Sequence, residues 1–317
     1  MSDIYPAKLA SEFGTIWKRF WFTQASDRLT AQMRIAVGVI CLVWLYSFST
    51  DVGALFGPNG IVSTQAVHNI EAASLVTDSP SDWRFSILDY CTTDSQVSTV
   101  HIIAFALVAA FTIGFATPFT SVASLILVSS FVQRAPILFG ATEHLLLLAL
   151  LYLCIAPCGR LLSLDAFLKK RNPTELLAEE RSVRSNICLR LIQLHVAMIL
   201  LYSGLTKLSG IVWWNGEAVW WILVQPESAL VDFSSLGGSL LGELTMNAWT
   251  YCIVIVELLA ATFIWFRLAR PLIMGLAILV YLSLILLTGL VGYGVLMIVL
   301  LFAFLHHSEQ TVLPCKI

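Results

Sequence analysis

Long apolar runs separated by short charged segments are the dominant pattern of this chain. Several runs reach the ~20 residues that a helix needs to cross the hydrocarbon core of a bilayer. We expect about eight helices, of which the third and fourth are short, at roughly 32–50, 98–117, 120–134, 142–156, 186–208, 247–266, 270–288 and 291–306. The pattern therefore predicts an all-α fold, a polytopic helical bundle integral to a membrane.

Composition strengthens this prediction. Of the 317 residues, 58% are hydrophobic and 12% are charged, whereas a typical soluble domain has about 45–50% apolar and about 25% charged residues. The net charge of −2 gives no basis for a nucleic-acid partner. The chain contains no HExxH, P-loop or Rossmann glycine motif, and its seven cysteines form no CxxC pair, so we expect neither a metal nor a nucleotide site.

The charged residues between the runs predict a topology through the positive-inside bias. Acidic residues dominate 51–97 and 209–246, whereas basic residues dominate the N-terminal arm and the 157–185 segment. We therefore expect both termini in the cytoplasm of a cell whose plasma membrane the chain crosses many times. We expect three divisions: a cytoplasmic arm at 1–31, a transmembrane domain at 32–306 and a cytoplasmic tail at 307–317. Within the transmembrane domain, we expect outer loops at 51–97 and 209–246 and a cytoplasmic linker at 157–185.

Lys207 is the most informative single residue. It ends a long apolar run, and no further Lys or Arg occurs before Arg267. A charge at mid-bilayer costs about 2.5–3.5 kcal/mol on insertion scales and less near the interface. Desolvation favours the neutral amine, so Lys207 is a candidate general base. The alternative is that its ammonium group simply extends to the interface, as lysines near helix ends commonly do.

Two other ionisable residues are candidates for the same site. Glu257 lies within an apolar helix, where it either joins helices as a hydrogen-bonded carboxyl or pairs with a buried lysine. His144 follows Glu143 at the outer start of the fourth helix, at a depth similar to that of Lys207. Such a histidine is commonly a cap or an interface group, and the shared depth favours a functional role.

A tryptophan-rich segment follows Lys207. Residues 213–224 mix Trp and aliphatic side chains with Asn215 and Glu217, which predicts a re-entrant or interfacial helix, because tryptophan favours that depth. Tyr202, Trp213 and Trp214 are candidates for an aromatic wall around a ring-shaped ligand. The alternative is that these three side chains are interfacial anchors.

The order of these features resembles the HTTM domain family, which includes the vitamin K-dependent γ-glutamyl carboxylases. The similar stretches are Arg34 with the aliphatic run after it, 56–60 (FGPNG), 156–160 (APCGR) with 163–165 (SLD), and 202–208 (YSGLTKL) with 213–216 (WWNG). The last stretch is similar to the family's Y-x-x-G-x-x-K-L motif, in which Gly204, Lys207 and Leu208 match and Tyr202 lies one position closer to the glycine. The likeness extends over roughly 25–306.

The resemblance implies a function and assigns roles. In the carboxylases, the lysine of this motif is the proposed base that deprotonates reduced vitamin K, so the resemblance gives that role to Lys207. It matches His144 and Glu257 to a family histidine and acid, and it implies a reduced quinone of the vitamin K or menaquinone type as cofactor. Glu143, Glu217, Tyr202, Gly204, Trp213 and Trp214 are then candidates for substrate binding.

The chain also departs from the carboxylases. The carboxylases have Asn at the position of Glu143 and a histidine in the stretch that corresponds to 281–284 (YLSL). They also have a large propeptide-binding region after the helices, where this chain has the eleven residues after His306. These differences favour the short bacterial members, similar to SdpB-type proteins, which are associated with the maturation of secreted peptide toxins.

We therefore expect a membrane-embedded enzyme that acts at the outer face on a quinol or a secreted peptide, with Lys207 as general base. Its pocket is expected between the fourth, fifth and sixth helices. One alternative is a non-catalytic membrane partner in the maturation or export of a peptide toxin, beside a separate maturation protein. Another alternative is a transporter or an immunity protein, although the chain lacks the paired Gly/Pro-broken helices of many transporters.

Overall fold

The computed structural model describes residues 4–61, 85–168, 181–224 and 239–305, and the side chains from residue 8 onward. The chain divides into two compact units, residues 1–188 and 189–317, which are considered one at a time. The boundary lies inside one long helix, α10. The sequence predicted a single transmembrane domain and contained no signal for this division.

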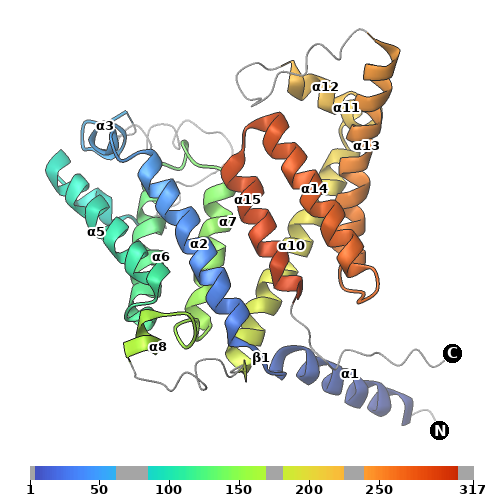
Figure 1. Ribbon diagram of the computed structural model, residues 1–317, viewed down its shortest axis with the longest axis horizontal. Coiled ribbons are helices and arrows are strands. Elements are labelled where there is room, and N and C mark those ends of the chain that lie inside the picture. Colours follow the sequence, from blue (N-terminus) through green and yellow to red (C-terminus); the bar gives the residue numbers. More distant parts are fainter. Residues whose placement is uncertain (1–3, 62–84, 169–180, 225–238, 306–317) are drawn as a thin grey trace. The chain divides into compact units, whose positions relative to one another are not determined.

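Unit 1 is a group of helices in which α5, α6 and α7 pack in sequence and α2 packs against α5 and α7 (Figure 1). Two short strands, β1 and β2, pair antiparallel beside the start of α10. Its elements are α1 (Ile4–Phe22), β1 (Ala25–Ser26), α2 (Asp27–Ser47), α3 (Val52–Phe56), η1 (Ile87–Tyr90), α5 (Asp94–Ile113), α6 (Thr117–Arg134), α7 (Ala141–Ile155), α8 (Leu164–Leu168), β2 (Arg181–Ser182) and the first turns of α10 (Val183–Leu208).

Unit 2 contains the rest of α10 and three further long helical segments. α13 packs against α14, α14 packs against α15, and the short helix α12 contacts both α13 and α14 (Figure 1). Its elements after α10 are α11 (Ile211–Trp214), α12 (Ala218–Leu223), α13 (Leu240–Phe263), α14 (Arg270–Thr288), α15 (Val291–Leu301) and η3 (Phe302–Leu305).

Each of the eight expected helices is present. Within the described ranges, α2, α5, α10, α13 and α14 are long and apolar enough to cross a membrane, and α7 and α15 with η3 are shorter apolar helices. This supports an all-α helical membrane protein. The number of crossings, the side of each terminus and the identity of the membrane stay predictions.

The distribution of side chains also fits a lipid environment. Large aliphatic side chains are exposed on the long helices, among them Val43 (63%), Ile102 (67%) and Leu279 (63%), while Ser124 and Thr250 are completely buried. A soluble helix shows the reverse arrangement, with its apolar face inward. In a bilayer, small polar residues serve at helix–helix contacts and aliphatic ones face lipid.

The side chain of Arg34 connects two segments of unit 1 that are far apart in the sequence. Its guanidinium is fully buried on α2 and donates to the carbonyl oxygens of Cys158 (2.8 Å) and Leu162 (2.5 Å). Asp165 in the same connection accepts from the backbone amide groups of Ala116 and Thr117, at 2.8 and 2.9 Å, and so caps α6. Arg34 therefore fastens α2 to the α7–α8 connection.

Candidate functional site

Lys207 forms the centre of a buried polar cluster in unit 2. Its Nζ lies 2.8 Å from Oε1 and 2.6 Å from Oε2 of Glu257, and it also donates to the Ser203 hydroxyl. The carboxylate side chain of Glu257 is 3% exposed and the Lys207 side chain is 17% exposed. Both oxygens of the acid therefore contact the ammonium group, and the cluster keeps a narrow opening at the lysine.

Helix geometry accounts for the cluster. Ser203 and Lys207 are four residues apart on the last turns of α10, so their side chains share one face. Gly204 lies between them, and a Cβ atom there would be 2.7 Å from Cδ2 of Leu258 on α13. The absence of a side chain at Gly204 lets the two helices approach closely enough for Glu257 to reach Nζ.

The segment after α10 covers the lysine end of the cluster. The chain turns at Gly210 into α11, and the Trp213 ring centroid lies 5.3 Å from Nζ of Lys207, a distance that permits a cation–π interaction. The indole of Trp214 donates to the carbonyl of Leu208, and the Tyr251 hydroxyl donates to the carbonyl of Trp214 at 2.7 Å. These bonds hold α11 against the end of α10 and the middle of α13.

Two tyrosines, one buried and one half-buried, lie near Glu257. Tyr281 on α14 and Tyr293 on α15 have ring centroids 6.2 Å apart, and both lie close enough to the Glu257 carboxylate to interact with it electrostatically. Together with Ser203 and Lys207 they form a polar group that draws on four helices of unit 2. A group of hydroxyl, amine and carboxyl functions within apolar helices can exchange protons internally.

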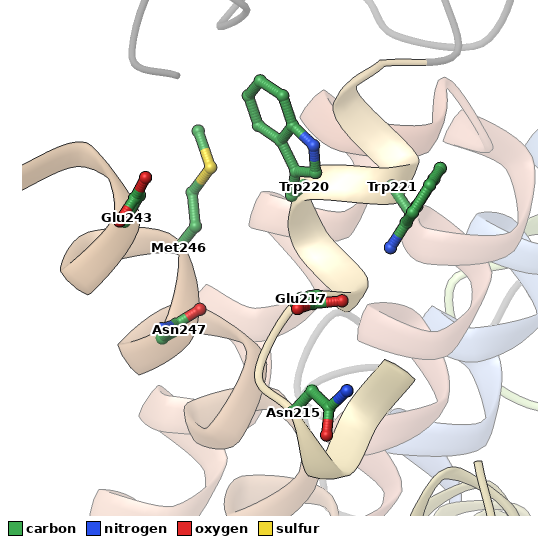
Figure 2. Close-up of a pocket in the computed structure, with 7 residues that line it drawn as sticks. All are labelled: Asn215, Glu217, Trp220, Trp221, Glu243, Met246 and Asn247. Atoms are coloured by element: carbon green, nitrogen blue, oxygen red, sulfur yellow. The ribbon is translucent and has the colours of Figure 1, made fainter. Parts of the chain in front are cut away.

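A cavity of about 500 Å³ opens beside the tryptophan-rich segment. Figure 2 shows Asn215, Glu217, Trp220 and Trp221 from the α11–α12 segment on one side and residues of α13 on the other. Two carboxylates, two amides and two indoles therefore line one space. The lining residues are Asn215, Glu217, Trp220, Trp221, Glu243, Met246 and Asn247. Asn247 precedes Glu257 by ten residues on α13, which is about 15 Å along a helix.

The segment expected to be one interfacial helix consists of the two short helices α11 and α12. They are separated by Gly216, whose φ of +76° is a left-handed conformation that glycine adopts readily. The backbone amide of Val219 donates to the buried hydroxyl of Thr250 at 3.2 Å, which attaches α12 to α13. The expected start of the sixth helix at 247 is wrong by two turns, since Ser239 caps α13 by accepting from the amide of Gly242.

The remaining predicted residues have different surroundings. Tyr202 is 73% exposed, Gly204 is buried in the helix contact, and Trp214 is exposed. Glu217 lines the cavity, and Trp213 faces the lysine. Of the three residues expected to act together, Lys207 and Glu257 are in direct contact.

His144 and Glu143 belong to unit 1. The Nδ1 atom of His144 lies 2.6 Å from the carbonyl oxygen of Gly140, one turn back on α7. Glu143 accepts from the amide of Gly140 at 2.8 Å and from the indole of Trp44 at 3.1 Å, so it caps α7 and fastens it to α2. The joint action of His144 with Lys207 stays a prediction.

Several residues of the site were not predicted. Ser203 could have been found from its spacing, because it is four residues before Lys207 and so shares a helix face with it. The sequence offered a weaker indication for Tyr281 and Tyr293, namely a hydroxyl group within an apolar helix. Trp220 belongs to the tryptophan-rich 213–224 segment but was not assigned to the site. Glu243 and Asn247 gave no signal, since the cavity depends on how α12 packs against α13.

Arg134 was missed in unit 1. It is 3% exposed and pairs with Asp89 at 3.0 Å, at the point where the 85–93 segment returns to α6.

Within the described ranges, no group of three or more His, Cys, Asp or Glu side chains is arranged to hold a metal ion. Comparison of the chain with protein-family models, curated proteins and solved structures found no match.

Proposed function

We propose that this protein is a membrane-embedded enzyme with acid–base chemistry at Lys207, acting at the outer face of a plasma membrane on a quinol, a secreted peptide, or both. The observation that supports this proposal is the contact of Lys207 with both oxygens of Glu257 and with Ser203, at the partly open end of an apolar helix. The resemblance to the vitamin K-dependent carboxylases points to the same lysine.

The geometry supports a base role through Glu257. A base must hold Lys207 as the neutral amine, and the Glu257 carboxylate is in direct hydrogen-bond contact to take up the ammonium proton. Nζ then accepts the proton of a quinol hydroxyl, and the ammonium that forms balances the charge of the anion. Ser203 keeps Nζ oriented during both transfers.

Two neighbouring features provide binding surfaces. Trp213 presents an indole beside Nζ, which suits a flat quinol ring. The cavity with Glu217 and Glu243 suits a peptide segment that carries a positive charge, because carboxylates and indoles both attract cations. A secreted peptide held there lies about three turns along α13 from Glu257.

A second candidate function is a non-catalytic partner in peptide maturation. The specific observation in its favour is that both carboxylate oxygens are bonded to Lys207, which is the arrangement of a structural ion pair. In that case the pair can be replaced by apolar residues without loss of function.

Epoxide formation by purified protein in lipid tests the enzyme proposal. Reduced menaquinone or vitamin K is supplied with oxygen, one atom of which enters the epoxide while the other leaves as water, and the product is followed by mass spectrometry. We expect epoxide from the wild type and none from Lys207→Ala or from the double variant Lys207→Met with Glu257→Leu.

Thr206→Ala is the matched control, since among the described residues its hydroxyl bonds to carbonyl oxygens of its own helix, at Tyr202 and Ser203. Its activity should equal that of the wild type. Epoxide formation by the double variant would reject Lys207 as the base. A folded wild type that forms no epoxide would reject the quinol as substrate and favour the maturation partner.

A further inference from the structure

The N-terminal helix α1 separates apolar from polar side chains. At 100° per residue, Leu9, Phe13, Ile16, Trp17 and Phe20 fall on one side of the helix. The other side carries the polar residues Lys8, Ser11, Glu12, Thr15, Lys18 and Arg19, and the apolar Phe22 at the last position of the helix. An isolated stripe of this kind marks a helix that needs an apolar surface to lie against.

The apolar side of α1 is open in the structure. Leu9, Phe13, Ile16 and Trp17 are 56%, 63%, 55% and 52% exposed. Phe13 and Trp17 form a row along the helix with the half-buried Trp21, with ring centroids 6.1 Å apart between Phe13 and Trp17 and 5.8 Å apart between Trp17 and Trp21. Four large apolar side chains in one row form a patch of the kind that marks a protein or membrane contact.

The charge of α1 indicates the chemistry of the surface that covers it. Lys8, Lys18 and Arg19 are all exposed, and Glu12 is the single acid among the described side chains of the helix. Cations beside an aromatic and aliphatic face are typical of helices that lie in the headgroup region of anionic membranes. A second copy of α1 would instead bring like charges together.

The C-terminal end of α1 is held close to the start of α2, a helix that is long and apolar enough to cross a membrane. The side-chain amide of Asn186 donates to the carbonyl oxygens of Phe20 (2.9 Å) and Trp21 (2.8 Å), and α2 begins at Asp27. Asn186 itself is completely buried. α1 is therefore held near the level at which α2 enters the bilayer.

We infer that α1 is an interfacial helix that binds the surface of an anionic leaflet. Phe13, Ile16 and Trp17 insert between the headgroups and the upper acyl chains, and Lys8, Lys18 and Arg19 contact lipid phosphates. The positive-inside bias predicts that this is the cytoplasmic leaflet. The inference does not depend on the proposed chemistry at Lys207.

Photo-crosslinking of the full-length protein in lipid nanodiscs tests this inference. Benzoyl-phenylalanine replaces either Phe13 on the apolar side or Thr15 on the polar side, and adducts are identified by mass spectrometry. Ile102, an exposed aliphatic residue of the apolar helix α5, is the positive control for lipid contact. We expect lipid adducts at 13 and 102 that exceed those at 15 several-fold.

Lipid composition and charge supply the second comparison. Adducts at 13 should increase when about a quarter of the phosphatidylcholine is replaced by phosphatidylglycerol. The increase should disappear in the triple variant Lys8→Gln, Lys18→Gln and Arg19→Gln. Labelling of lipid at 102 but not at 13, equal lipid labelling at 13 and 15, or crosslinks from 13 to a second copy of the chain would each overturn the inference. Adducts at 13 that do not respond to phosphatidylglycerol would overturn its electrostatic part.

Discussion

Lys207 and Glu257 stabilise each other because each removes the cost of the other's burial. A buried ion that loses its partner costs about 3–5 kcal/mol, whereas replacement of a whole buried pair by apolar residues is close to neutral. The same contact can therefore serve catalysis or merely structure. Stability measurements on the pair establish its structural contribution, and the epoxide assay establishes its chemistry.

We predict that Lys207→Met lowers the free energy of unfolding by about 3 kcal/mol, because Glu257 is left 3% exposed without its cation. The double variant Lys207→Met with Glu257→Leu should recover most of this loss. Denaturant unfolding in detergent measures both values. Additive losses in the double variant would show that the two side chains do not interact.

We predict that Arg34→Met is strongly destabilising. It leaves the carbonyl oxygens of Cys158 and Leu162 without their shared donor, and each hydrogen bond to a charged group is worth about 1.5–3 kcal/mol. Arg28→Gln is the matched control, an exposed arginine on the same helix whose loss should change the unfolding free energy by less than about 0.5 kcal/mol. Thermal unfolding of both variants in detergent tests the difference, and equal melting temperatures would contradict it.

At the scale of elements, the contact between α10 and α13 depends on a glycine. We predict that Gly204→Ala destabilises unit 2 by about 1–3 kcal/mol and lowers activity, because the new methyl group meets the Leu258 side chain at 2.7 Å. Combination with Leu258→Ala should restore part of both. Gly275→Ala on α14 is the matched control.

A Cβ atom at Gly275 has no neighbour within 4 Å, so alanine there should improve the helix by up to about 1 kcal/mol. Unfolding curves and the epoxide assay are the measurements for both glycines. A Gly204→Ala variant as stable and active as Gly275→Ala would show that close approach of α10 to α13 is not required.

Sequence predicted the presence of the eight apolar helices, but it misplaced the start of α13 and missed the break between α11 and α12. Apolar runs long enough to cross a bilayer form helices, because lipid offers no hydrogen-bond partners to backbone N–H and C=O groups and a helix satisfies these groups internally. The start of α13 was misplaced because 240–246 mixes polar residues with leucine, and only the Ser239 cap marks it. The break between α11 and α12 depends on a single turn at Gly216, which composition does not reveal.

At the scale of the whole molecule, topology gives a prediction that labelling can test. Cys91 is half-buried at the end of η1, in a segment expected outside, and Cys315 belongs to the tail expected inside. An impermeant maleimide should label Cys91 in intact cells and Cys315 only after permeabilisation, as mapped by peptide mass spectrometry. Labelling of Cys315 in intact cells would show that the orientation is the reverse of the predicted one. Loss of the label in Cys91→Ser would confirm that the label in intact cells is on Cys91.

The pH dependence of labelling provides an internal check. Burial raises the pKa of the Cys91 thiol and raises that of Cys158 to about 11. Thiolate is the reactive form, so a raised pKa reduces reactivity at neutral pH and the labelling rate of Cys91 should increase as the pH rises from 7 to 9. Cys158, with about one part in a thousand as thiolate at pH 8 and 1% exposure, should stay unlabelled until the protein is denatured.

The amino-acid sequence by itself determined the all-α class and the positions of the long helices, and it singled out Lys207 as an isolated charge at the end of an apolar run. These features follow from apolar length and from the cost of a charge in lipid. Only the tertiary structure decided that Glu257 rather than another acid pairs with Lys207, that α12 and α13 enclose a cavity, that Arg34 fastens α2 to the α7–α8 connection, and that α1 has an open apolar side. Each of these depends on which helix faces contact each other. Contacts between residues far apart in sequence arise from packing, and one chain's order of apolar and polar positions does not specify them.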